Sequence, residues 1–143
     1  MKWITREKVK VDRVACPWLI KHFIDADAEF LFVPAGQVLT EADKLRATPF
    51  DALGAKLHHR GERVSFDAFL DDYHLDDPAL RLMAEVVRTA DAEQSHPHPA
   101  GEGLKWIAQG FAQLGLTDHQ ILSREFIMYD ALYAECQRRV DKS

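Results

Sequence analysis

The sequence predicts a single α+β domain that is mostly helical and carries a small β-sheet of short strands. Apolar residues recur at helical spacing through most of the second half of the chain, whereas the strand-like runs lie near the N-terminus. The chain has 143 residues, of which 47% are hydrophobic and 29% charged, as is usual for one globular domain with one contiguous core. We therefore treat residues 1–143 as one domain.

The first half of the chain predicts the strands and the first helix. Alternating residues indicate a short strand or two over 2–11, and the compact apolar run 29–33 indicates a strand in the centre of the sheet. Asp12 is expected to cap the helix between them, whose first turn must hold Pro17 because proline is tolerated only there. The remaining elements expected in this half are a weak helix over 36–46 and a short helix capped by Ser65.

The second half predicts three helices. Asp77, followed by a proline, has the pattern of an N-cap and first helical residue. A second helix is expected over about 103–114, after a loop over 92–101 that is long enough to be mobile. Thr117 and Gln120 form a capping box, in which each side chain satisfies a backbone donor of the other, and they start a long final helix.

Composition narrows the classes of function. The net charge of -5 argues against general nucleic-acid binding and against attachment to anionic membranes, which both use basic residues. Cys16 and Cys136 are the only cysteines, so no disulfide framework is indicated and the chain suits a reducing cytosol. The N-terminus lacks a signal-peptide pattern, and no window approaches the roughly 18 apolar residues of a membrane span. We expect a soluble, cytoplasmic protein with no membrane or nucleic-acid partner.

Residues 3–25 read WITREKVKVDRVACPWLIKHFID. This segment resembles the start of the C-terminal domain of the bacterial chromate-resistance ChrB family, which has Trp–x–Thr–Arg, then Asp–Arg–x–Ala–Cys–x–Trp–Leu–Ile, then Phe–Ile–Asp. Further matching pieces are Pro49–Phe50–Asp51, Val87–Arg88 before Asp91, and Asp130–Ala131–Leu132–Tyr133. The resemblance covers essentially the whole chain and implies a role in the response to chromate. Longer family members carry an additional N-terminal regulatory domain, so DNA binding is not expected of this domain alone.

Four residues near the first predicted helix would suit a small oxyanion such as chromate. A helix N-terminus offers backbone donors and a partial positive charge, which Arg13 and Lys21 on the helix and Arg6 on the preceding strand would reinforce. In the same turn the thiolate of Cys16 would be stabilised, which would make it reactive or a metal ligand. The alternative is structural, with Arg13 paired to Asp12, Asp25 or Asp51 and Cys16 a small buried apolar group.

A metal site is the second hypothesis. His59, Asp91 and His119 would form a mixed nitrogen and oxygen set for zinc or iron, at positions that match polar positions of the family. Asp91 is expected at the C-terminal end of a helix, where a carboxylate needs compensation. Asp118 and Asp130 could support the site from behind the ligands. Alternatively, His59 is only a turn residue and His119 only an early-helix residue.

Three functions are therefore open. The one we favour is a chromate-response domain whose polar pocket binds a small oxyanion or a metal ion. The others are a zinc- or iron-dependent enzyme of unknown substrate, and a structural or partner-binding module. The tyrosine-rich last helix would suit either a homodimer surface or the core.

Overall fold

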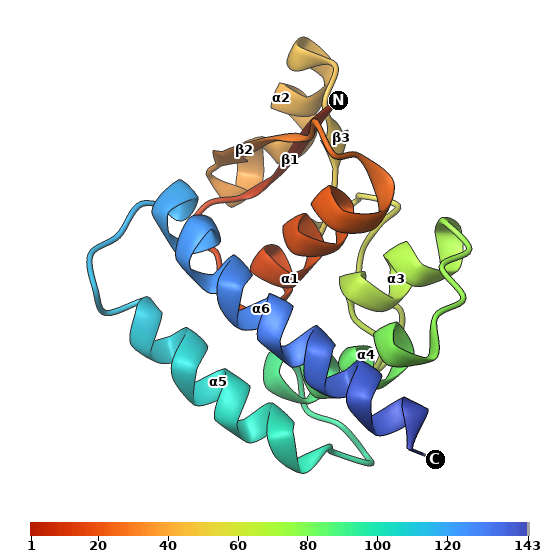
Figure 1. The fold of residues 1–143 in the computed structure, drawn as a ribbon. Helices are drawn as coiled ribbons and strands as arrows, with labels where there is room; N and C mark the ends of the chain where they lie inside the picture. Colours follow the sequence, from red (N-terminus) through yellow and green to blue (C-terminus); the bar gives the residue numbers. More distant parts are fainter. Residues whose placement is uncertain (143) are drawn as a thin grey trace.

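The computed structural model describes residues 1–142, and this part of the chain forms the mostly helical α+β domain that the sequence predicts. Figure 1 shows the small sheet at one end together with α2, and the other helices grouped below it. The strands are β1 (Lys2–Arg6), β2 (Glu29–Val33) and β3 (Thr48–Pro49). The α-helices are α1 (Asp12–Leu19), α2 (Val38–Leu45), α3 (Ser65–Asp72), α4 (Pro78–Asp91), α5 (Pro99–Phe111) and α6 (Asp118–Asp141), with a π-helical turn at Ile20–Ile24 and a 3-10 turn at Ala35–Gln37.

The sheet is parallel, with the strand order β2-β1-β3. The expectation that residues 29–33 form the central strand is therefore wrong, because β1 takes that place. Trp3, Ile4 and Thr5 are all fully buried, so both faces of β1 are covered despite the polar residues in its pattern. In β2, by contrast, Phe30 is buried while the residues after it are partly exposed, as befits an edge strand.

The helices build the core around the sheet. Helix α6 packs along both α1 and α4, and α5 packs on α4, an arrangement visible in Figure 1. The main core extends from Trp3 through Trp18 to Tyr129, whose hydroxyl donates to the carbonyl of Val11. Tyr129 therefore belongs to the core rather than to an outer surface. No helix in the described part of the chain is long and apolar enough to cross a membrane.

Helix α1 begins differently from the prediction. Val11 occupies the N-cap position and Asp12 is already helical, so Asp12 does not cap its own helix. The carbonyl of Val11 accepts the amides of Val14 and Ala15. Pro17 lies inside the helix, which continues as a π-helical turn. Because proline cannot donate a hydrogen bond, α1 lacks one bond of its ladder at this point. Since Asp12 does not cap α1, its carboxylate is available for another partner.

The caps expected in the second half are confirmed. Asp77 accepts the amides that follow it, and the Thr117–Gln120 capping box is formed. Helix α5 begins at Pro99, earlier than expected, with His98 as its cap. Gly101 allows α5 to approach α4 closely, since an added Cβ would lie 2.3 Å from the Cβ of Thr89. Because α5 begins at Pro99, the loop between α4 and α5 is shorter than the one that the sequence predicts over 92–101.

Candidate functional site

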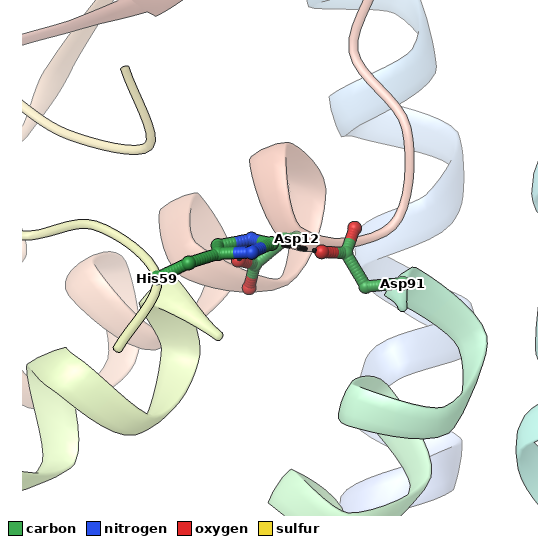
Figure 2. Close-up of side chains that lie close together, drawn as sticks. All are labelled: Asp12, His59 and Asp91. Carbon is green, nitrogen blue, oxygen red and sulfur yellow. Dashed lines mark ion pairs between the residues drawn. The ribbon is translucent and has the colours of Figure 1, made fainter. Parts of the chain in front are cut away.

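Three aspartates from distant parts of the chain meet around the imidazole of His59. The Nε2 atom of His59 lies 3.1 Å from Asp91 Oδ2, 3.4 Å from Asp51 Oδ1 and 3.6 Å from Asp12 Oδ2. In Figure 2 the ring of His59 points toward Asp91, at the end of α4, and Asp12, on the first turn of α1, lies close behind the ring. We call Asp12, Asp51, His59 and Asp91 the His59 cluster. Its defining feature is three carboxylates around one ring nitrogen.

Asp12 is the most deeply placed member. Its side chain is fully buried, and it accepts the backbone N–H groups of Ser65 at 2.8 Å and Phe66 at 3.0 Å. These are the first amides of α3, so Asp12 caps a helix that begins more than fifty residues further along the chain. Burial raises the pKa of Asp12 to about 7, although its bond with His59 opposes this rise.

His59 carries the positive charge of the cluster. Its contacts with Asp12 and then Asp91 raise its pKa to about 10, because both carboxylates stabilise the imidazolium. The imidazole is therefore protonated at neutral pH. The ring of His58 stacks on it, with centroids 5.2 Å apart. The Nδ1 atom of His58 is buried, has no hydrogen-bond partner, and lies 3.8 Å from Asp51 Oδ1.

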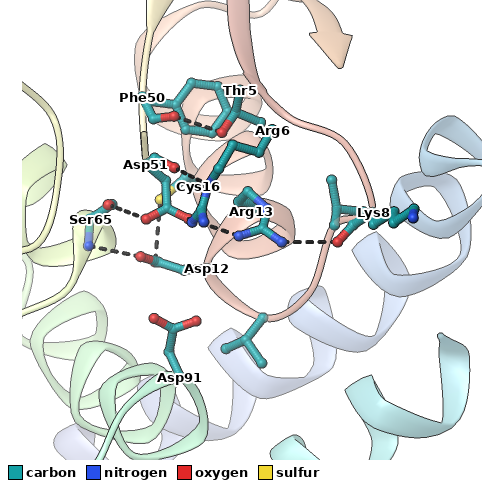
Figure 3. Close-up of polar contacts among 12 residues, drawn as sticks. Thr5, Arg6, Lys8, Asp12, Arg13, Cys16, Phe50, Asp51, Ser65 and Asp91 are labelled. Carbon is teal, nitrogen blue, oxygen red and sulfur yellow. Dashed lines mark hydrogen bonds and ion pairs between the residues drawn. The ribbon is translucent and has the colours of Figure 1, made fainter. Parts of the chain in front are cut away.

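Two arginines also reach Asp51, and Figure 3 shows the side chains of Arg6 and Arg13 beside it. Arg6 donates to the Asp51 carbonyl at 2.9 Å and to its Oδ2 at 3.2 Å. Arg13 Nη1 lies 3.5 Å from the same Oδ2, and its Nη2 donates to the carbonyl of Lys8. The Nε atom of Arg13 is buried without an acceptor. Burial, followed by the neighbouring Arg6, lowers the pKa of Arg13. Two guanidinium groups thus converge on one carboxylate.

The other residues expected to bind an oxyanion lie differently. Cys16 is fully buried, and its Sγ lies 3.4 Å from Asp12 Oδ1. Burial and the charge of Asp12 raise the pKa of this thiol well above its usual value. The expectation of a stabilised thiolate at Cys16 is therefore corrected: the structure favours the protonated thiol. Lys21 is exposed in the π-helical turn beyond α1 rather than beside the arginines.

The structure brings together only part of the expected metal set. His59 and Asp91 are in contact, but the third residue beside them is Asp12 rather than His119. The ring of His119 packs instead against Phe32, with centroids 5.0 Å apart. The ligand set is thereby revised, because the first turn of α6 faces the edge strand β2 and not the cluster.

The two expected supporting carboxylates have other partners. Asp118 accepts the backbone amides of Lys8 and Val9, at 3.1 and 2.8 Å, and so holds the loop that leads into α1. Asp130 accepts the indole N–H of Trp18 at 2.7 Å and lies 3.2 Å from His22 Nε2. Asp118 therefore positions the segment before Asp12, whereas Asp130 belongs to a separate pair.

Asp12, His59 and Asp91 can each offer one ligand atom, and these atoms all lie within 4.8 Å of one another. One imidazole nitrogen and two carboxylate oxygens are donors that zinc and iron accept. The cluster thus presents two kinds of chemistry side by side. The arginines that contact Asp51 suit an anion, and the carboxylates of the cluster suit a cation.

Comparison with known proteins agrees with the resemblance seen in the sequence. Residues 3–136 match the family model described as the C-terminal domain of ChrB. The chain belongs to this family. A curated relative, Protein ChrB of Cupriavidus metallidurans, is 33% identical to this ChrB domain over 138 residues. The alignment covers 92% of this chain and 40% of the relative, so the chain spans about two fifths of that protein's length. No solved structure matches.

The sequence named Asp51 as a possible partner of Arg13, and this pair is formed, but it did not indicate that Asp12 and Asp51 both meet His59 in this ChrB domain. Both belong to motifs that carry the family resemblance, the Asp–Arg pair before Ala15 and the Pro–Phe–Asp step after β3. Asp51 also has a positive φ of 47°, which is uncommon for a residue other than glycine. The motif signal was present, but it did not indicate which residues would meet.

Proposed function

We propose that this ChrB domain is a chromate-response domain whose polar pocket binds a small oxyanion between Arg6, Arg13 and His59. The observation that carries the proposal is the pair of guanidinium groups sharing Asp51, one of which has a buried Nε without an acceptor. Membership of the family supplies the chromate context. His59 adds a third cation close to the same carboxylate.

The charge balance of the site is compatible with an anion. Arg6, Arg13 and protonated His59 face Asp51 and Asp91, while burial raises the pKa of Asp12 to about 7, so this carboxyl carries only part of its negative charge at neutral pH. Arginine has five N–H donors in a planar fork, so each guanidinium can bind Asp51 and an oxyanion together. Because the chain has a net charge of -5, long-range steering would repel chromate, and binding must depend on these short-range contacts.

Equilibrium dialysis or calorimetry with chromate tests the proposal. Arg13→Gln removes a charge-assisted donor, and we expect binding to weaken by about 10- to 100-fold, since such bonds contribute about 1.5–3 kcal/mol. The matched control is Arg81→Gln, which removes an exposed arginine paired with Asp76, and it should bind as the wild type does. Equal affinity for wild type and Arg13→Gln, or no chromate binding by the wild type, would contradict the proposal.

A metal-dependent enzyme is the second candidate. It is favoured by the convergence of Asp12, His59 and Asp91, with Asp12 in the position that we expected His119 to fill. Metal-dependent turnover that disappears in Asp91→Asn would support this reading over simple oxyanion binding.

A further inference from the structure

We infer that the His59 cluster also forms a binding site for one divalent transition-metal ion, with Asp12, His59 Nε2 and Asp91 as its ligands. This inference goes beyond the proposed oxyanion pocket and does not rest on it. It replaces the set expected from the sequence, because His119 lies elsewhere.

The first argument is geometric. Protein ligands of zinc stand about 2.0–2.2 Å from the ion, so two ligand atoms of one ion stand roughly 3–4 Å apart. The Nε2 atom of His59 lies 3.1 Å from Asp91 Oδ2 and 3.6 Å from Asp12 Oδ2. The ligand atoms of all three residues fall within 4.8 Å of one another. One ion can therefore be reached by all three.

The second argument concerns charge. The Nε2 atom of His59 carries a single hydrogen, which can bond well to one carboxylate at a time, yet three carboxylates lie within 3.6 Å of it. Asp91 is also the last residue of α4, where the helix dipole disfavours a negative charge. A divalent cation in place of that one proton would compensate Asp12 and Asp91 together.

A third, independent observation lies at the edge of the cluster. The Nδ1 atom of His58 is buried, without a hydrogen-bond partner, beside Asp51. Unpaired buried polar atoms are few in folded proteins, and a bound ion is one reason for such an atom to persist. The stacked pair of imidazoles thus leaves one ring nitrogen unpaired beside Asp51, a member of the same cluster.

Hydrogen bonds from the surrounding structure already orient Asp12, one of the proposed ligands. Asp12 is fixed by the two amides of α3, and the loop before it is fixed by Asp118 and by the hydroxyl of Tyr129. Such supporting bonds orient metal ligands and preserve affinity. A nitrogen donor with two carboxylates favours Zn²⁺, Mn²⁺ or Fe²⁺ over Mg²⁺ and Ca²⁺, which prefer all-oxygen sites. Water would complete the coordination.

The test uses tag-free protein that has been treated with a chelator and then dialysed against Zn²⁺. Bound zinc is measured by elemental analysis, and affinity by calorimetry. We expect about one zinc ion per chain for the wild type and binding at least about 10-fold weaker for Asp91→Asn and His59→Gln, as is usual when a ligand is removed. Asp12 is left unchanged because it also caps α3.

Two control variants define the outcome. Asp76→Asn removes an exposed carboxylate in the loop between α3 and α4. A variant with both His96 and His98 replaced by glutamine removes the histidines of the loop before α5. Both should keep the zinc. Wild-type zinc binding by Asp91→Asn, or loss of zinc in the loop variant alone, would overturn the inference. Arg13→Gln should keep zinc while losing chromate, so this site and the proposed function can fail separately.

Discussion

Two histidine–aspartate pairs in this domain have nearly the same nitrogen–oxygen distance and very different surroundings. His59 and Asp91 approach to 3.1 Å, and His22 and Asp130 to 3.2 Å. His22 and Asp130 have side chains that are 41% and 54% exposed, and a single carboxylate faces the ring. His59 meets three carboxylates, two of which, those of Asp12 and Asp51, are buried. Distance alone therefore does not identify a site, whereas burial and the number of converging charges do.

The energetic meaning of the two pairs also differs. An exposed ion pair contributes about 0–1 kcal/mol because water screens it. A buried carboxylate loses its hydration and must recover that cost from hydrogen bonds, as Asp12 does through the α3 amides and His59. Changes at the buried cluster should accordingly affect both folding and binding, while changes at the exposed pair should affect neither strongly.

The largest expected effect is that of Asp12→Ala. This change leaves the first amides of α3 without their acceptor and removes one of the three carboxylates around His59, so we expect a loss of about 3–5 kcal/mol in the free energy of unfolding. Urea unfolding followed by circular dichroism measures it. A loss below about 1 kcal/mol would mean that the buried Asp12 contributes no more to stability than the exposed Asp130, and the two pairs would then not differ.

Glu125 sharpens the comparison, because it is buried with an oxygen that has no hydrogen-bond partner. Burial raises its pKa to about 7. The folded protein keeps this proton where the unfolded chain has lost it, so stability falls as pH rises from about 4.5 to about 7. Glu125→Gln should remove this fall and be more stable than wild type by about 1–3 kcal/mol above pH 7.

Unfolding in urea across this pH range checks the prediction for Glu125. The exposed Glu85→Gln on α4 is the matched control and should leave the slope unchanged. If Glu125→Gln and wild type show parallel curves, the buried carboxyl does not take up a proton on folding.

The smallest expected effect is that of Asp130→Asn. The exposed pair with His22 is lost, but the amide oxygen can still accept the indole N–H of Trp18. We expect a change below about 1 kcal/mol, with chromate and zinc binding unaffected. Thermal unfolding and the two binding assays measure this. A large loss of binding would extend the functional site to the outer face of α1 and α6.

The elements that sequence predicted well are those with local signals. Asp77 and the Thr117–Gln120 pair cap helices within a few residues of themselves, and both caps form. Asp12 looks locally like a cap for α1, but its partners are the amides of Ser65 and Phe66, far away in the chain. Nothing in the local pattern could indicate that pairing.

The same distinction explains the metal ligands and the sheet. His59 and Asp91 were predicted to lie together and do, whereas His119 faces Phe32 because the packing of α6 turns its first turn toward β2. The apolar run of β2 looks central, yet parallel pairing on both sides puts β1 there. Local composition predicts element types, but tertiary packing decides which residues meet.

The measurement that tests the account most directly is NMR of the imidazole rings during titration with chromate and, separately, with Zn²⁺. The account predicts that His59 responds to both ligands, followed by His58 because the two rings are stacked. The other histidines should stay unchanged: His22, His74, His96, His98 and His119. Responses confined to those residues, with His59 unchanged, would contradict the assignment of the functional site to the His59 cluster.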